Sequence, residues 1–289
     1  MHTLIENLLA EAPVVLDGAM GTQLQARGLP IGACPDVWNV EEPDKVREVA
    51  RAYAEAGSRI VLTNTFGATR IALERCGYGD RAAEVNRAGA RLAREGAGAA
   101  ALVFGSIGPS GAMLAMGEVE PEAVEAAFRE QAEALAEGGA AGLVIETMSD
   151  LEEAVLAVKA AKSTGLPVAA CMAYGSGKAG DRTMMGVTPE QAAEGLAAAG
   201  ADVVGANCGP EMETMIAICA RLKAAVDLPI WMKPNAGAPK LVDGQAVSPM
   251  TVEEFVQGSR ELVVQGADFV GGCCGSTPDF IRALAEDFA

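Results

Sequence analysis

Three cysteines near the ends of two apolar runs are the residues of this chain best suited to chemistry. Cys208 follows the run 202–206, and the adjacent pair Cys273 and Cys274 follows the run 267–270. Neighbouring residues of a regular strand point to opposite sides, so glycines on both sides of the pair are expected to free the backbone there. Three thiolates around Zn²⁺ leave one tetrahedral position open, which is typical of a catalytic site. The pattern predicts a zinc site that activates a substrate thiol.

The other cysteines and the one histidine limit which residues could bind the metal. Free cysteine is often a small buried apolar residue, and this alternative is preferred for the four cysteines at positions 34, 76, 171 and 219. The chain has one histidine, His2, so a transition-metal site must rely on cysteine with help from carboxylate, amide or water. A sulfur-rich zinc site generates hydroxide poorly, but it can bind a further thiol and keep it nucleophilic. Alkyl transfer to a thiol is the chemistry that fits.

Two acidic residues stand directly after apolar runs. Asp17 follows the first run and Glu146 follows the fourth. A pair of carboxylates could hold the ammonium group of a substrate. Equally, Asp17 could cap the following turn, and Glu146 could pair with a backbone amide.

Hydroxyl and amide groups occupy similar positions. Thr63, Asn64 and Ser106 follow the second and third runs and could bind a substrate carboxylate, or they could only shape turns. Asn235 lies in a proline–glycine segment between the two cysteine-bearing runs. Its amide oxygen could fill the open zinc position until substrate arrives, or it could be an ordinary turn residue.

The elements that must position these side chains repeat eight times. Short runs rich in Val, Ile and Ala each lead through a polar or glycine turn into a helical pattern. The predicted strands are 14–16, 59–62, 101–105, 142–145, 167–173, 202–206, 229–233 and 267–272, and the predicted helices are 44–56, 80–95, 121–137, 150–163, 189–199, 211–225, 252–265 and 278–285. Continuous apolar strands indicate a parallel sheet covered on its outer face. Eight such units predict one (β/α)8 TIM barrel over residues 1–289, with a short helix in 1–11 over one end.

Three connections are longer than the others: 21–43, 109–120 and 175–188. All follow strands, so a barrel places them on its C-terminal face, where loops carry function. The polar, glycine-rich connection 175–188 is expected to become ordered on binding.

Composition excludes several classes of protein. A formal charge of −17 argues against nucleic acid or an anionic membrane surface as the main partner, and no apolar run reaches the length of a membrane span. An odd number of cysteines, seven, with no disulfide-like spacing, favours a reducing compartment, and we expect the cytoplasm.

At these residues the sequence resembles the homocysteine S-methyltransferase family over nearly its whole length. The segments that carry the resemblance are Asp17-Gly18-Ala19-Met20-Gly21-Thr22, Thr63-Asn64-Thr65-Phe66-Gly67, Ile145-Glu146-Thr147, Asn207-Cys208-Gly209, Pro234-Asn235-Ala236-Gly237 and Gly271-Gly272-Cys273-Cys274-Gly275. The family includes the homocysteine-binding domain of cobalamin-dependent methionine synthase and betaine–homocysteine methyltransferase.

The resemblance implies a role for each motif. Cys208, Cys273 and Cys274 would hold zinc, and the thiolate of homocysteine would become the fourth ligand. Asp17 and Glu146 would hold its amino group. The resemblance also places Gly18 beside the substrate and makes Asn235 the oxygen ligand of the substrate-free site.

The methyl donor is the point on which the family divides. The Pro-Asn-Ala-Gly segment is more similar to methionine synthase than to the betaine enzyme, which favours a separate methyl-cobalamin (corrinoid) protein as donor and partner. S-methylmethionine, S-adenosylmethionine or betaine are alternative donors, and a thiol without an amino group is an alternative acceptor. A barrel that binds metal and substrate without catalysis is the non-enzymatic alternative.

Overall fold

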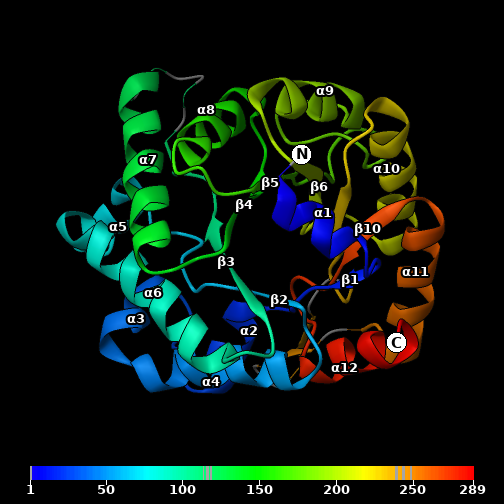
Figure 1. Cartoon of the computed structure of the whole chain (residues 1–289), viewed down its shortest axis with the longest axis horizontal. Coiled ribbons are helices and arrows are strands. Elements are labelled where there is room, and N and C mark those ends of the chain that lie inside the picture. Colours follow the sequence, from blue (N-terminus) through cyan, green and yellow to red (C-terminus); the bar gives the residue numbers. More distant parts are fainter. Residues whose placement is uncertain are drawn as a thin grey trace.

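The predicted barrel is confirmed by a computed structural model that describes residues 2–112, 114, 117, 119–237, 240–242, 245–247 and 249–289. Its eight parallel strands are β1 (Val14–Val15), β2 (Ile60–Leu62), β3 (Leu102–Ile107), β4 (Gly142–Met148), β5 (Val168–Met172), β6 (Val203–Asn207), β7 (Ile230–Lys233) and β10 (Ala267–Val270). They pair in the order β1-β10-β7-β6-β5-β4-β3-β2. A parallel bridge between Leu16 and Ile60 joins the two end strands, β1 and β2. Figure 1 shows the strands arranged in a ring inside the helices.

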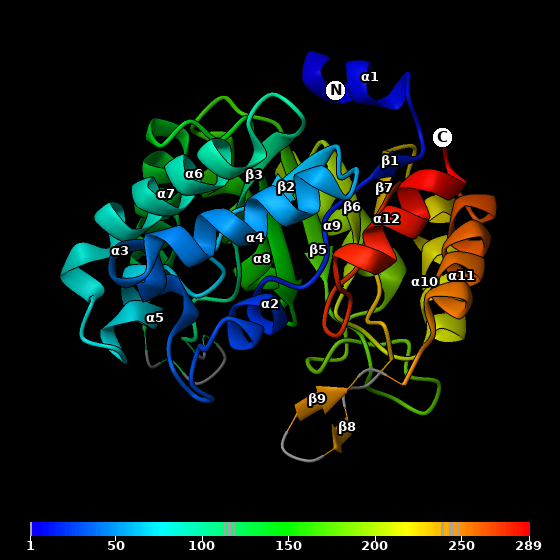
Figure 2. The ribbon, with the colours of Figure 1, turned by 90° about the horizontal axis from the view of Figure 1, so that it is seen from below.

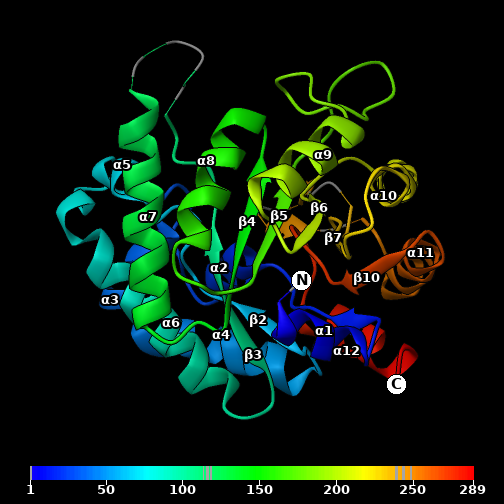
Figure 3. The ribbon, with the colours of Figure 1, turned by 45° about the horizontal axis from the view of Figure 1, so that its top comes forward.

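Eight helices form the outer ring, and their positions agree with the predicted helical patterns. They are α4 (Pro43–Glu55), α6 (Ala82–Ala97), α7 (Pro121–Glu137), α8 (Leu151–Lys162), α9 (Pro189–Ala199), α10 (Met212–Ala225), α11 (Val252–Val264) and α12 (Pro278–Asp287). Figure 3 shows α6 to α11 following one another around the strands. The side chains of Asp150, Thr188 and Thr277 cap three of these helices.

Several short elements lie in segments that we predicted as connections. The segment after β1 forms α2 (Met20–Ala26), η1 (Pro35–Val37) and α3 (Trp38–Glu41), and the segment after β2 forms α5 (Arg70–Glu74) and η2 (Gly79–Arg81). A hairpin of β8 (Lys240–Val242) and β9 (Gln245–Val247) follows β7. Helices of three to five residues span too few turns to give a clear apolar period, and α2 buries only Leu24 of its seven residues, so the sequence did not indicate these elements. The connection 109–120 lies only partly within the described residues.

The barrel interior is filled in layers. At its N-terminal end, α1 (Thr3–Leu9) buries Ile5 and Leu8 against the strands, as expected for a short helix over one end. The middle layer stacks three aromatic rings: Trp231 lies 6.1 Å from Phe104 and 5.4 Å from Phe269 between ring centroids. Two residues further along the same strands the interior becomes polar, which directs chemistry to the C-terminal end of the barrel.

Figure 2 shows α1 and both chain termini at one end of the barrel, and the β8–β9 hairpin at the other. The hairpin follows the C-terminal end of β7, so it marks the face on which the strand-end cysteines lie. Within the described part of the chain, no helix has the length and apolar character needed to cross a membrane.

Candidate metal and thiol site

The three predicted cysteines come together at the C-terminal end of the barrel. Their Sγ atoms all lie within 4.8 Å of one another, and those of Cys208 and Cys274 are 3.7 Å apart. Two sulfurs bound to one tetrahedral zinc ion at about 2.3 Å are about 3.8 Å apart. Of the described residues, Cys208, Cys273 and Cys274 form the one group of three or more ionisable side chains with such spacing.

The backbone leaves strand geometry at both cysteine segments. Cys208 follows β6 directly and has a φ of 50°, a left-handed conformation that non-glycine residues rarely adopt outside functional sites. Strand β10 ends before Cys273, whose amide donates to the Pro234 carbonyl at 2.8 Å. Both adjacent thiols can therefore face the same point.

The glycines around the cysteine pair act differently from our expectation. Only Gly275 of the three has a positive φ, 82°. At Gly272 a Cβ atom would lie 2.3 Å from Ser276 Oγ, and at Gly271 it would lie 2.6 Å from the Leu16 Cβ. These two glycines are needed because other parts of the chain approach closely, and not because of backbone conformation.

Hydrogen bonds among the thiols favour one thiolate in this cluster. Bonds from Cys208 and Cys273 lower the pKa of Cys274 to about 3. Bonds with Cys273 and Cys274 raise the pKa of Cys208.

The remaining cysteines lie apart from the cluster. Cys171 and Cys219 are buried as expected, but Cys76 is exposed near the end of α5, so the prediction of a buried thiol was wrong there.

Asn235 lies next to the cluster with one of its amide atoms unused. Its Nδ2 donates to the Gly209 carbonyl at 3.0 Å, which holds the side chain beside the loop that follows Cys208. Its Oδ1 is buried and accepts no hydrogen bond from the described residues. A buried acceptor without a donor fits an oxygen ligand, so the residues present suit a metal held by three sulfurs and one oxygen.

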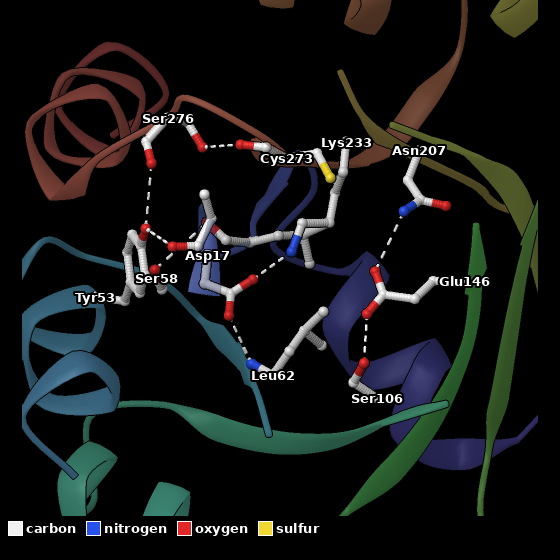
Figure 4. Close-up of polar contacts among 12 residues, drawn as sticks. Asp17, Tyr53, Ser58, Leu62, Ser106, Glu146, Asn207, Lys233, Cys273 and Ser276 are labelled. Atoms are coloured by element: carbon white, nitrogen blue, oxygen red, sulfur yellow. Dashed lines mark hydrogen bonds and ion pairs between the residues drawn. The ribbon is translucent and has the colours of Figure 1, made fainter. Parts of the chain in front are cut away.

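Asp17 has a partner that the sequence analysis did not identify. Lys233 Nζ, at the end of β7, pairs with Asp17 Oδ1, and the side chains are 3% and 1% exposed (Figure 4). The Leu62 amide donates to Asp17 Oδ2 at 2.7 Å, so both carboxylate oxygens are engaged. Burial alone would lower the pKa of Lys233, but the carboxylates of Asp17 and Glu146 outweigh it and raise that pKa. Lys233 is therefore charged at neutral pH.

Glu146, on β4, is held by side chains from β3 and β6. Ser106 on β3 donates its hydroxyl to Oε1, and Asn207 on β6 donates to Oε2 at 3.3 Å. Asn207 also donates to Thr147 Oγ1 at 2.8 Å and accepts from the Thr147 amide at 2.7 Å. Burial raises the pKa of Glu146 to about 7, although Lys233 and Ser106 lower it. This carboxyl group can exchange its proton near neutral pH.

The predicted turn residues mainly hold neighbouring segments. Thr63 Oγ1 bonds Thr65 Oγ1 at 2.5 Å and accepts from the Ser106 amide at 2.9 Å. Asn64 donates to the Pro35 carbonyl and to Asn39, so its amide nitrogen fixes the connection after β1. A Cβ at Gly18 would lie 2.8 Å from both Tyr53 Oη and Ser276 Oγ, so only glycine fits there.

A cavity of ≈ 330 Å³ connects these groups. Nine of the ten predicted site residues line it, and the tenth, Asn235, lies beside it: the lining includes Asp17, Gly18, Thr63, Asn64, Ser106, Glu146, Cys208, Cys273 and Cys274. The lining carries three thiols together with carboxylates, hydroxyls and one ammonium. The cavity therefore suits a small molecule that carries both a sulfur and charged groups.

A family model described as homocysteine S-methyltransferase matches residues 14–288. The chain belongs to the homocysteine S-methyltransferase family. The resemblance inferred from the motifs is thus confirmed. The chain is 30% identical to methionine synthase of Mycobacterium tuberculosis. The match covers 98% of this chain but only 25% of that relative. The chain is 34% identical to betaine–homocysteine S-methyltransferase 1 of Mus musculus, over 99% of this chain and 74% of that relative.

A solved structure of the family has a similar fold. The metallated form of the homocysteine methyltransferase MmuM from Escherichia coli superimposes with a TM-score of 0.78 and 26% identity, over 95% of this chain and 96% of that one. Members of the homocysteine S-methyltransferase family thus share the barrel, and one of them has been solved with metal.

Three further residues of this family member support the site and were missed from sequence. Tyr53 donates to the Ala19 carbonyl at 2.9 Å and so holds the segment after Asp17. Asn207 and Lys233 occupy the last interior positions of β6 and β7, where they pair in register. The alternation of interior residues, from Trp231 to Lys233, was a usable signal: a lysine on the interior side of an apolar strand needs an anionic partner.

Proposed function

We propose that this chain is a zinc-dependent methyltransferase that converts the thiol of homocysteine to the thioether of methionine. The observation that carries the proposal is the cluster of Cys208, Cys273 and Cys274 in a cavity that is also lined by buried charged groups. The family membership supports the same reaction.

Each side chain has a role in this proposal. Cys208, Cys273 and Cys274 would hold the metal, and Asn235 Oδ1 would be available as an oxygen ligand. Zinc, when bound, supplies a centre that lowers the pKa of a thiol and keeps its sulfur nucleophilic. Glu146 faces the amino group of homocysteine, held in place by Ser106 and Asn207.

We propose a methyl-corrinoid (methyl-cobalamin) protein as the methyl donor, which the similarity to methionine synthase supports. The sulfur forms the new bond to the methyl carbon, the bond from carbon to the donor breaks, and the donor keeps that electron pair. A donor on another protein must approach the face where the cavity opens, since the N-terminal end of the barrel is closed by α1.

Metal analysis combined with calorimetry tests the acceptor half of this proposal. We expect about one zinc per chain and homocysteine binding in the wild type, and loss of both in Cys273→Ala. Cys76→Ala removes an exposed thiol outside the cluster and should change neither. Absence of zinc from carefully reduced wild-type protein would refute the mechanism.

A donor screen tests the other half. Zinc-loaded protein and homocysteine are incubated in turn with methyl-cobalamin, S-methylmethionine, S-adenosylmethionine and betaine, and methionine is quantified. We expect product with methyl-cobalamin. Product with another donor alone would keep the methyltransferase and replace the corrinoid partner, and binding without product from any donor would favour a substrate-binding subunit.

A further inference from the structure

The cavity contains an ammonium group of its own in the place where two carboxylates were expected to hold that of the substrate. Lys233 pairs with Asp17, and its charge also interacts with that of Glu146 (Figure 4). The Lys233 side chain is 3% exposed, so it cannot extend into solvent without leaving the barrel interior. Among the described residues that line the cavity, it is the one cation.

The charges around Lys233 bear on which end of a substrate binds there. An acceptor ammonium placed between Asp17 and Glu146 would meet the like charge of Lys233, and each oxygen of Asp17 already accepts one hydrogen bond. A lysine ammonium has three donors, and its one described hydrogen bond is to Asp17. An acceptor carboxylate can therefore bind Lys233 through a charge-assisted hydrogen bond while the thiol reaches the cysteine cluster.

We propose that Lys233 determines acceptor specificity by binding the carboxylate of the substrate, so that this site selects mercapto-carboxylic acids and depends more on the carboxylate than on the amino group. Homocysteine is one member of this class. The inference rests on the proposed function, because it concerns the acceptor of that same site.

Two half-substrates test the inference on the zinc-loaded wild-type protein. 4-Mercaptobutyrate is homocysteine without its amino group, and 3-aminopropanethiol is homocysteine without its carboxylate. Calorimetry measures their binding without requiring any methyl donor. We expect 4-mercaptobutyrate to bind roughly 10- to 100-fold more tightly than 3-aminopropanethiol, the range of a charge-assisted contact. The reverse order, or equal affinities, would overturn the proposal.

Variants then assign the preference to Lys233. Lys233→Met keeps the length of the side chain and should bring the two affinities within a few-fold of each other. Because it leaves Asp17 buried without its partner, the double variant Lys233→Met/Asp17→Asn is measured alongside it. Lys162→Met, at the ion pair with Asp202 outside the cavity, should keep the wild-type preference. A preference that survives both Lys233 variants contradicts the assignment.

These outcomes separate the inference from the function on which it rests. If homocysteine binds and 3-aminopropanethiol binds as well as 4-mercaptobutyrate, the methyltransferase proposal stands and the role of Lys233 fails. If neither homocysteine nor the half-substrates bind to zinc-loaded protein, the thiol acceptor itself is wrong and both fall.

Discussion

Gly272 determines how closely the cysteine pair approaches the segment that follows it. A Cβ there would lie 2.3 Å from Ser276 Oγ and 2.5 Å from Ser276 Cβ, and Ser276 itself donates to the Cys273 carbonyl at 2.7 Å. We expect Gly272→Ala to displace Cys273 and Cys274, to reduce zinc affinity at least tenfold and to destabilise the fold by about 1–3 kcal/mol. Competition with a chromogenic chelator and urea unfolding measure the two effects.

Gly21 offers a matched control for that substitution. It lies in α2, has no positive φ, and a Cβ added there would meet nothing within 4 Å. Gly21→Ala should therefore leave zinc affinity unchanged and leave stability unchanged or slightly raised. Equal zinc affinity in Gly272→Ala and wild type would show that the close approach at residue 272 does not position the thiols.

Glu146 makes stability depend on pH. Its folded-state pKa of about 7 lies above the ordinary value of 4.5 for a glutamate, so the fold favours the protonated form. This contribution is complete below pH 4.5 and is lost as pH rises through 7, by about 3 kcal/mol in total. We expect Glu146→Gln to lose less stability than the wild type between pH 5 and 8, measured by urea unfolding of metal-depleted protein. The exposed substitution Glu122→Gln should follow the wild-type curve, and parallel curves for all three would contradict the raised pKa.

Helix α1, which lies outside the eight strand–helix units, contributes to the stability of the barrel. Ile5 is fully buried in the same cluster as Leu16, Trp231 and Phe269. We expect Ile5→Ala to lower the free energy of unfolding by about 2–5 kcal/mol, because the barrel floor cannot collapse into the space. Asn7→Ala, exposed on the same helix, should stay within about 0.5 kcal/mol of the wild type in urea unfolding. A loss in Ile5→Ala no larger than this would mean that α1 is not part of the core.

The eight strand–helix units were predictable from sequence because each element carries its own local signal. Apolar runs mark the strands, and cap residues such as Thr188 mark where helices begin. The positions of the three cysteines followed, since the carboxyl ends of barrel strands lie on one face. The pairing of Lys233 with Asp17 did not follow, because 216 residues separate them and only the closed barrel brings them together. Helix α2 was missed because Leu24 is its one buried residue, so its sequence shows no apolar period.

The closed barrel has one junction that is weaker than the others. Strands β1 and β2 are joined by the Leu16–Ile60 bridge and a hydrogen bond from the Arg59 amide to the Val15 carbonyl, whereas β4 and β5 are paired at four positions. We expect the Arg59 amide to exchange with deuterium at least tenfold faster than the Leu143 amide, which bonds the Pro167 carbonyl. Amides between β5 and β6 serve as the reference for a fully paired junction. Equal protection at Arg59 and Leu143 would contradict local opening.

Both chain termini lie at the end of the barrel opposite the cysteine cluster (Figure 2). A tag or a fused module at either terminus therefore emerges away from the cavity and leaves its entrance open. A fused module that must deliver a group to the cavity would need a long connecting segment. This segment must run the full height of the barrel along its outer helices. The length of the segment, and not only the affinity of the module, would then set how often the delivered group meets the cavity.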